Sequence, residues 1–152
     1  MGFRAAARVR YAEGLVLADA GHSGGAVYLW GYAGEMILKA AYFRAIGFTP
    51  GRPILPVDLR AAKAGAPELG VTWVGNWHDV QAWAGVLVRV RSRQPTGAYR
   101  NPACGLRVGR TGIRLGRVWR EALRYHTNTP YPHEIRDVRE AAGWLVEHSL
   151  RL

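Results

Sequence analysis

A run of arginines without any acidic residue is the strongest chemical signal in this 152-residue chain. Between Val80 and Arg120 there are nine arginines and no aspartate or glutamate, so this segment carries nearly all of the net charge of +10. The chain prefers arginine to lysine throughout, but that preference does not explain the missing acids. The pattern predicts a surface that binds a phosphate-bearing partner. The candidate phosphate-binding residues are Arg89, Arg91, Arg93, Arg100, Arg107, Arg110, Arg114, Arg117 and, just beyond the segment, Arg124.

Ser23 lies in the pentapeptide Gly21-His22-Ser23-Gly24-Gly25, which matches the G-x-S-x-G pattern of the nucleophile elbow in α/β-hydrolases. A serine hydrolase using Ser23 is therefore a remote alternative. That fold places several strands before the nucleophile, however, and only 22 residues precede Ser23. The simpler interpretation makes Ser23 the N-cap of the helix that follows, because a serine hydroxyl can accept hydrogen bonds from the first free amides.

Metal and cofactor chemistry are not indicated by the remaining polar residues. His78 and Asp79 stand together as a conceivable ligand pair, but an acidic residue at the start of a helix is usually a cap, and no matched set of ligands occurs elsewhere. The sequence contains no phosphate loop, dinucleotide-binding or kinase pattern. We therefore expect no metal and no cofactor. The single cysteine, Cys104, excludes an internal disulfide and suits a reducing compartment.

Length and composition are typical of one compact domain over residues 1–152. Hydrophobic residues make up 49% of the chain and include six tryptophans, which is enough to form a core. The N-terminal residues lack the pattern of a secretory signal, and no segment reaches the roughly 18 apolar residues of a membrane span. We expect a soluble, cytoplasmic protein without membrane contact.

The hydrophobic periodicity predicts an all-α fold. The expected helices cover about 3–20, 25–46, 57–64, 76–93, 115–126 and the residues from Pro132 onward. In this interpretation Asn76 is the N-cap of the fourth segment, and the last one buries Ile135, Val138, Ala142 and Leu145. The glycine- and proline-rich segment 95–112 is expected to be a loop, with a small hairpin over 106–115 as the alternative.

The segment 25–46 is too apolar to lie on a surface. At about 100° per residue its polar side chains fall in one stripe about 80° wide, and apolar residues cover the rest of the circumference. We therefore predict that this helix lies in the middle of a bundle. The stripe, which we expect to face a groove or a dimer partner, contains Tyr28, Tyr32, Glu35, Lys39 and Tyr42. Glu35 should pair with a cation, either Lys39 or an arginine from the acid-free segment.

This helix resembles one in bacterial proteins of the HEPN (higher eukaryotes and prokaryotes nucleotide-binding) domain family. That helix reads, in general form, A-x-Y-L-A-G-Y-A-x-E-x-x-L-K-A, and the matching residues are Ala26, Tyr28, Leu29, Gly31, Tyr32, Ala33, Glu35, Leu38, Lys39 and Ala40. Trp119, Arg124 and Tyr125 are similar to the W-x-x-x-x-R-Y segment before the last helix of such proteins. The resemblance implies a four- or five-helix bundle, usually dimeric and often encoded beside a minimal nucleotidyltransferase.

The resemblance also implies a candidate active site. Nuclease members carry an arginine, four to six residues and then a histidine, a pattern that Arg120 and His126 match, with Glu121 as the polar residue after the arginine. Histidine can move the 2′-hydroxyl proton and arginine can stabilise the phosphorane, so no metal is required. On one continuous helix the two side chains would point about 240° apart, so they converge only through a helix break or a dimer partner. Alternatively, His126 is a core or interface histidine.

Two functions of different classes follow. The first is an RNA- or nucleotide-binding HEPN-type homodimer, which in its catalytic form is a metal-independent endoribonuclease of a toxin–antitoxin or defence pair. The second is a non-catalytic helical module whose basic segment docks an acidic partner, such as a minimal nucleotidyltransferase.

Overall fold

The computed structural model describes residues 2–94, 102–125 and 129–152. Within these residues the chain forms six α-helices and no strand, so the all-α prediction is confirmed. The helices are α1 (Phe3–Asp19), α2 (Ser23–Ala45), α3 (Pro56–Gly65), α4 (Val80–Ser92), α5 (Pro102–Val118) and α6 (Pro132–His148). Two 3₁₀ segments, Pro67–Leu69 and Glu121–Tyr125, follow α3 and α5.

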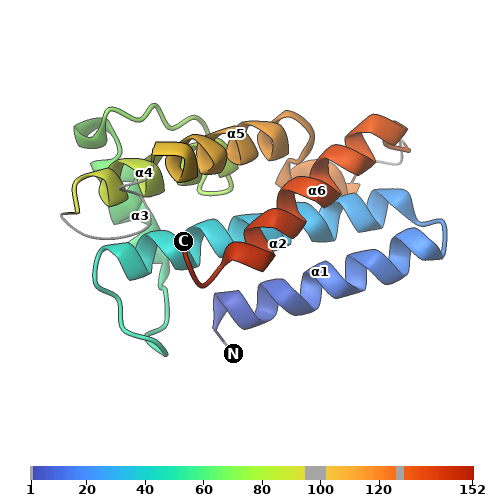
Figure 1. Cartoon of the computed structure of the whole chain (residues 1–152), viewed down its shortest axis with the longest axis horizontal. Coiled ribbons are helices and arrows are strands. Elements are labelled where there is room, and N and C mark those ends of the chain that lie inside the picture. The colour runs from blue at the N-terminus through green and yellow to red at the C-terminus, as the bar shows by residue number, and fades with distance from the viewer. Residues whose placement is uncertain (1, 95–101, 126–128) are drawn as a thin grey trace.

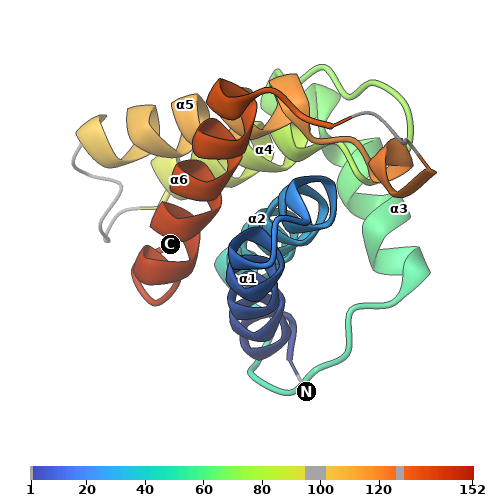
Figure 2. The ribbon, with the colours of Figure 1, turned by 90° about the vertical axis from the view of Figure 1, so that its right-hand side faces the viewer.

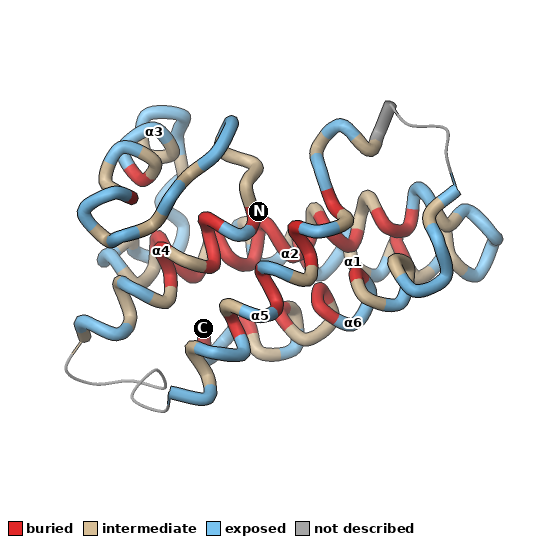
Figure 3. The backbone as a smooth tube through the Cα atoms, turned by 90° about the horizontal axis from the view of Figure 1, so that it is seen from above, coloured by how far each residue is buried: buried red, intermediate tan, exposed pale blue. Residues whose placement is uncertain are grey.

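The apolar helix α2 lies in the middle of the bundle, as predicted (Figures 1 and 2). It contacts α1, α4, α6 and the 3₁₀ segment 121–125. Buried residues run along its length on nearly every side, which Figure 3 shows as a red core. Large side chains such as Trp30, Ile37 and Leu38 are almost wholly removed from solvent, and burial of each is worth about 1.5–3 kcal/mol.

A tight turn joins α1 to α2. Gly21 adopts a φ of +81°, a conformation that glycine takes without strain, and the amide of His22 donates back to the carbonyl of Leu17 at 2.8 Å. This turn starts α2 at Ser23 itself, without a side-chain cap, so the prediction of Ser23 as the N-cap is wrong. The segment before Ser23 is helix α1, and the strand that a nucleophile elbow requires is not there.

Helix α5 is the largest departure from the sequence-based prediction. The chain is helical from Pro102, so the hairpin over 106–115 and the loop over 102–112 are wrong, and the helix expected over 115–126 ends at Val118. Residues 95–101 of the expected loop lie outside the described residues. Gly112, one of the glycines that suggested a loop, and Gly116 are packing positions against α4. A Cβ atom on Gly112 would lie 2.4 Å from that of Ala84, and one on Gly116 would lie 2.6 Å from the Cγ of Gln81. Small residues here let the two helices approach closely.

The start of α4 also differs from the prediction. Asp79, rather than Asn76, is the N-cap, and its carboxylate accepts from the amide of Ala82 at 3.0 Å. Asn76 instead closes a local turn, because its Oδ1 accepts from the backbone amide of His78 at 2.9 Å. Residues 70–79 thus form a connection that is fastened to the N-terminus of α4.

Helix α6 begins at Pro132 and buries Val138, Ala142 and Leu145, as predicted, whereas Ile135 is only partly buried. It crosses α2 on the side away from α3 (Figure 2). Among the described residues, none of the helices combines the length and the apolar character needed to cross a membrane.

Candidate functional site

Glu35 is the most deeply buried charge in the described part of the chain. Its side chain has no exposed surface, and it lies between Lys39, one turn along α2, and His78. The Nδ1 atom of His78 is 3.0 and 3.1 Å from the two carboxylate oxygens of Glu35. Burying a carboxylate is costly unless it is paired and hydrogen-bonded. The predicted Glu35–Lys39 pair is therefore confirmed, and His78 is a second partner that the prediction did not include.

Lys39 is buried as well, and its ammonium group lies 5.5 Å from the centre of the Trp83 ring. Tyr42 packs edge-on against the same ring, with the ring centres 5.5 Å apart. Lys39 and Tyr42 therefore face helix α4 of the same chain. Tyr28 and Tyr32, at the other end of the predicted stripe, stack on each other and remain partly exposed.

The connection formed by residues 70–79 holds His78 in position. Asn76 holds its backbone amide, and Asp79 caps α4 directly after it. The carbonyl of Trp77 accepts from the indole of the buried Trp83 at 2.9 Å. The backbone on both sides of His78 is therefore fixed to α4, which turns the imidazole towards Glu35 on α2.

The opposite edge of the His78 imidazole faces Glu121. The His78 Nε2 atom is 3.6 Å from the Oε2 atom of Glu121, and the amide of Asn76 donates to the same oxygen at 3.3 Å. An ionised carboxylate only accepts hydrogen bonds, so Nδ1 is the nitrogen of His78 that can donate to Glu35. The Nε2 atom is then available to accept or hold a further proton opposite Glu121. Glu35, His78 and Glu121 thus form a line from the core to the surface.

Trp119 fixes the segment that carries Glu121. Its indole is buried and donates to the carbonyl of Tyr28 at 3.0 Å. It lies directly over Gly31, where an added Cβ atom would be only 1.9 Å from the ring. The next residue, Arg120, is exposed and donates to the carbonyl of Trp119 at 2.9 Å. Packing of one tryptophan on α2 therefore places both Arg120 and Glu121.

His78, Asn76, Arg120 and Glu121 line one open cavity of about 780 Å³ between the start of α4 and the end of α5. The partly buried Tyr32 lies close to Glu35, and burial, followed by the charge of Glu35, raises the pKa of the Tyr32 hydroxyl above its usual value of 10. Tyr32 is therefore protonated at neutral pH. Within the described residues no set of three or more histidine, cysteine or acidic side chains is arranged to hold a metal ion. The cavity offers proton transfer next to a cation.

Four of the predicted phosphate-binding arginines recur along one face of α5, at steps of three and four residues: Arg107, Arg110, Arg114 and Arg117. Two of them have partners on α6. Arg114 forms ion pairs with Asp137 at 2.6 Å and Glu140 at 2.7 Å, and the bond to Asp137 contributes most to raising its pKa.

The remaining arginines of α5 differ in their availability. Arg107 lies over the Trp144 ring at 5.0 Å. Arg110 and Arg117 are exposed, and their side chains make no hydrogen bond or ion pair within the described residues. Arg110 and Arg89 of α4 line a groove of about 580 Å³ between the two helices. Ile113 lines both this groove and the His78 cavity, so the two hollows adjoin.

Other predicted site residues lie elsewhere. Arg91 donates to the carbonyl of Leu152, and Arg93 donates to the carbonyl of Glu68 at 3.2 Å, so both have intramolecular partners at the far end of α4. Arg100 and His126 are outside the described residues, as is the side chain of Arg124. The proposed meeting of Arg120 with His126 therefore remains a prediction.

His78 is the site residue whose role the sequence-based prediction missed. It was considered only as a metal ligand. Lys39 pairs with one side of the Glu35 carboxylate. The other oxygen of a buried carboxylate also needs a hydrogen-bond donor, and this need was the one signal that a further partner had to exist. That donor is 43 positions away in the chain, so no local spacing points to it.

Comparisons with protein-family models, with curated proteins and with solved structures gave no match. The structure is thus described as an all-α bundle in which the cluster of Glu35, Lys39 and His78 lies beside a basic groove.

Proposed function

We propose that this chain is an RNA-binding protein of the HEPN type that cleaves RNA without a metal, with His78 as the proton-transferring group. The observation that carries the proposal is the line of Glu35, His78 and Glu121, which ends in the same cavity as Arg120. A histidine backed by a buried carboxylate, in a cavity that an arginine also lines, is an arrangement suited to acid–base chemistry on a phosphodiester.

The reaction is an intramolecular transesterification. The Nε2 atom of His78 accepts the proton of a ribose 2′-hydroxyl, and the 2′-oxygen forms a bond to phosphorus. The bond from phosphorus to the 5′-oxygen then breaks, and the proton is returned from Nε2 to that leaving oxygen. Arg120 stabilises the charge on the pentacoordinate phosphorus. The products are a 2′,3′-cyclic phosphate and a 5′-hydroxyl, and no oxidant, metal or co-reactant is needed.

The groove between α4 and α5 supplies the backbone contacts of the bound RNA. Arg89 and Arg110 lie in the groove, Arg117 lies along the same face of α5, and Arg120 lies in the adjoining cavity. Among the described residues, no acidic side chain lines the groove. A single strand following this path would meet cations before reaching His78, which favours steering of a polyanion towards the site.

Cleavage of a fluorescent RNA in the presence of EDTA tests the catalytic part. His78→Gln should abolish cleavage, while His22→Gln, which changes an exposed histidine before α2, should leave the rate unchanged. His126→Ala distinguishes the two candidate histidines. If His78 transfers the proton, cleavage activity survives this substitution. Loss of cleavage in His126→Ala alone, with full activity in His78→Gln, would assign the chemistry to His126 instead.

The salt dependence of RNA affinity tests the binding part. Neutralising about three to five phosphates of a single strand predicts a slope of log K against log salt of roughly −2 to −3.5. Arg110→Gln should make this slope shallower by about 0.7, whereas Arg8→Gln on the exposed face of α1 should not change it. RNA affinity that is independent of salt would contradict the proposal.

A second candidate function has its own observation. Leu106 and Ile113 of α5 are 62% and 46% exposed, and they flank the arginine face. A mixed apolar and basic surface is suited to an acidic protein, such as a minimal nucleotidyltransferase. Stable co-elution with a neighbour-encoded acidic protein, lost in Ile113→Asp and combined with no RNA cleavage, would favour this candidate. Sedimentation of the isolated chain tests the proposed homodimer.

A further inference from the structure

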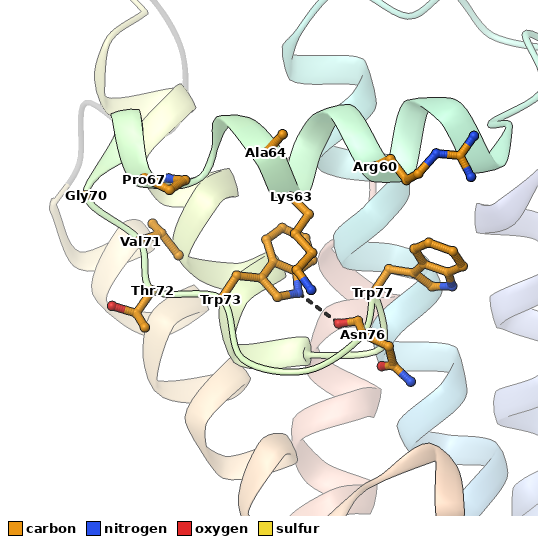
Figure 4. A pocket seen from close by; sticks show the side chains of 10 residues that line it. All are labelled: Arg60, Lys63, Ala64, Pro67, Gly70, Val71, Thr72, Trp73, Asn76 and Trp77. Atoms are coloured by element: carbon orange, nitrogen blue, oxygen red, sulfur yellow. Dashed lines mark hydrogen bonds between the residues drawn. The ribbon is translucent and has the colours of Figure 1, made fainter.

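A second cavity lies on the other side of the connection that carries His78. It has a volume of about 960 Å³ and is formed by α3, the 3₁₀ segment Pro67–Leu69 and residues 70–77 (Figure 4). The tryptophans Trp73 and Trp77 supply its aromatic lining, and Arg60 and Lys63 supply two cations. The acid–base chemistry proposed above makes no use of this cavity.

Trp77 differs from every other tryptophan in the chain. Four of them donate the indole N–H to a backbone carbonyl: Trp30, Trp73, Trp83 and Trp119. The fifth, Trp144, stacks on His148. Trp77 makes neither a side-chain hydrogen bond nor a ring contact within the described residues, and it is not packed against the hydrophobic core. Its ring is partly buried and lies on the cavity wall (Figure 4).

The charge of the cavity is complementary to a phosphate. Arg60 and Lys63 stand one helical turn apart on α3, and none of the described residues that line the cavity is acidic. Lys63 donates to the carbonyl of Gly75, which fastens α3 to the connection. Arg60 has no hydrogen bond or ion pair within the described residues. An aromatic face beside a guanidinium group matches a base and its phosphate.

We propose that this cavity binds one nucleobase of a single-stranded RNA, stacked on Trp77, with the adjacent phosphate held by Arg60. The inference rests on the RNA-binding function proposed above and adds a base-binding subsite to it. Asn76 lines both cavities, and Trp77 and His78 are consecutive, so a base on Trp77 lies next to the nucleotide that meets His78. The subsite accepts any base, because each base has an aromatic face and the cavity recognises it by stacking.

The test compares two oligonucleotides of roughly eight nucleotides, a length within known single-strand site sizes. One is a 2′-fluoro oligoadenylate, which lacks the attacking hydroxyl, and the other is an abasic strand of equal length and charge. Fluorescence anisotropy should show that the native chain binds the oligoadenylate about 5- to 100-fold more tightly than the abasic strand. Trp77→Ala should remove this difference, and Trp77→Phe, which keeps an aromatic face, should retain most of it.

Tyr131→Ala is the matched control, because it removes an exposed aromatic ring at the start of α6 and should leave both affinities unchanged. Equal affinity of the native chain for both strands would overturn the subsite while leaving RNA binding intact. A difference retained in Trp77→Ala would overturn it as well. If the native chain binds neither strand, the proposed function fails and the subsite fails with it.

Discussion

Replacing Gly31 with alanine should destabilise the protein, although alanine is the better helix former. The gain in helix propensity is about 1 kcal/mol. Against it, the new methyl group would lie 1.9 Å from the buried indole of Trp119, so the ring must move. Overpacking of this kind costs about 1–3 kcal/mol, and loss of the indole hydrogen bond to Tyr28 costs about 1 kcal/mol more. The net expected loss is about 1–3 kcal/mol.

Gly109→Ala is the matched control, since Gly109 is also inside a helix but has nothing within 4 Å of its added Cβ atom. It should stabilise the protein by about 1 kcal/mol. Thermal unfolding followed by circular dichroism measures both changes, because 1 kcal/mol shifts the Tm of a chain of this size by about 2–4 °C. Gly31→Ala should also slow RNA cleavage, because Trp119 places Arg120 and Glu121. A Gly31→Ala protein at least as stable as the native one would refute this role of Trp119.

Three further predictions concern buried groups. Lys39→Met should lower the free energy of unfolding by about 3–5 kcal/mol, because the buried Glu35 loses its charged partner. Lys63→Met, the control, should change the free energy of unfolding by less than about 1 kcal/mol. Urea titration measures both changes. Burial raises the pKa of Tyr42, so above pH 10 this tyrosine ionises first in the unfolded state and the free energy of unfolding falls. In urea titrations, Tyr42→Phe should be as stable as the native protein at pH 7 and more stable than it above pH 10. An equal loss of stability in both proteins above pH 10 would contradict this. Burial also raises the pKa of Cys104, so its alkylation by iodoacetamide should be slower at pH 8 in the folded protein than in urea, and an equal rate would contradict this.

The central position of helix α2 was predictable from the hydrophobic pattern of that helix alone. A helix that is apolar on nearly all sides can be stable only where other helices cover it, and α2 is covered by α1, α4 and α6. The pairing of Glu35 with Lys39 was also predictable, since residues four apart on a helix are neighbours. Both inferences depend on local geometry alone.

Helix α5 was not predictable by the same reasoning, because glycine has two opposite meanings. Taken locally, Gly105, Gly109 and Gly112 indicate a loop over 95–112. In the fold, Gly112 and Gly116 are contact points with α4, and this close approach offsets their poor helix propensity. The meaning of these glycines is decided by a helix that lies elsewhere in the sequence.

The candidate site, like the fold, was only partly predictable from the sequence. Arg120 and Glu121 were selected from the sequence, and the structure brings them to the cavity that His78 lines. His78 was not selected, because its partner Glu35 is on another helix and only the packing of α4 on α2 brings them together. Local patterns thus selected charged residues that share this cavity, but they did not indicate which residues meet there.

The most direct test of the central claim is the chemistry of the ends produced when the purified protein is incubated with RNA in EDTA. The account predicts fragments with a 2′,3′-cyclic phosphate and a 5′-hydroxyl, and no cleavage at a nucleotide whose 2′-hydroxyl has been replaced by hydrogen. An intact RNA, or cleavage that leaves 5′-phosphates or proceeds at the 2′-deoxy position, would contradict it.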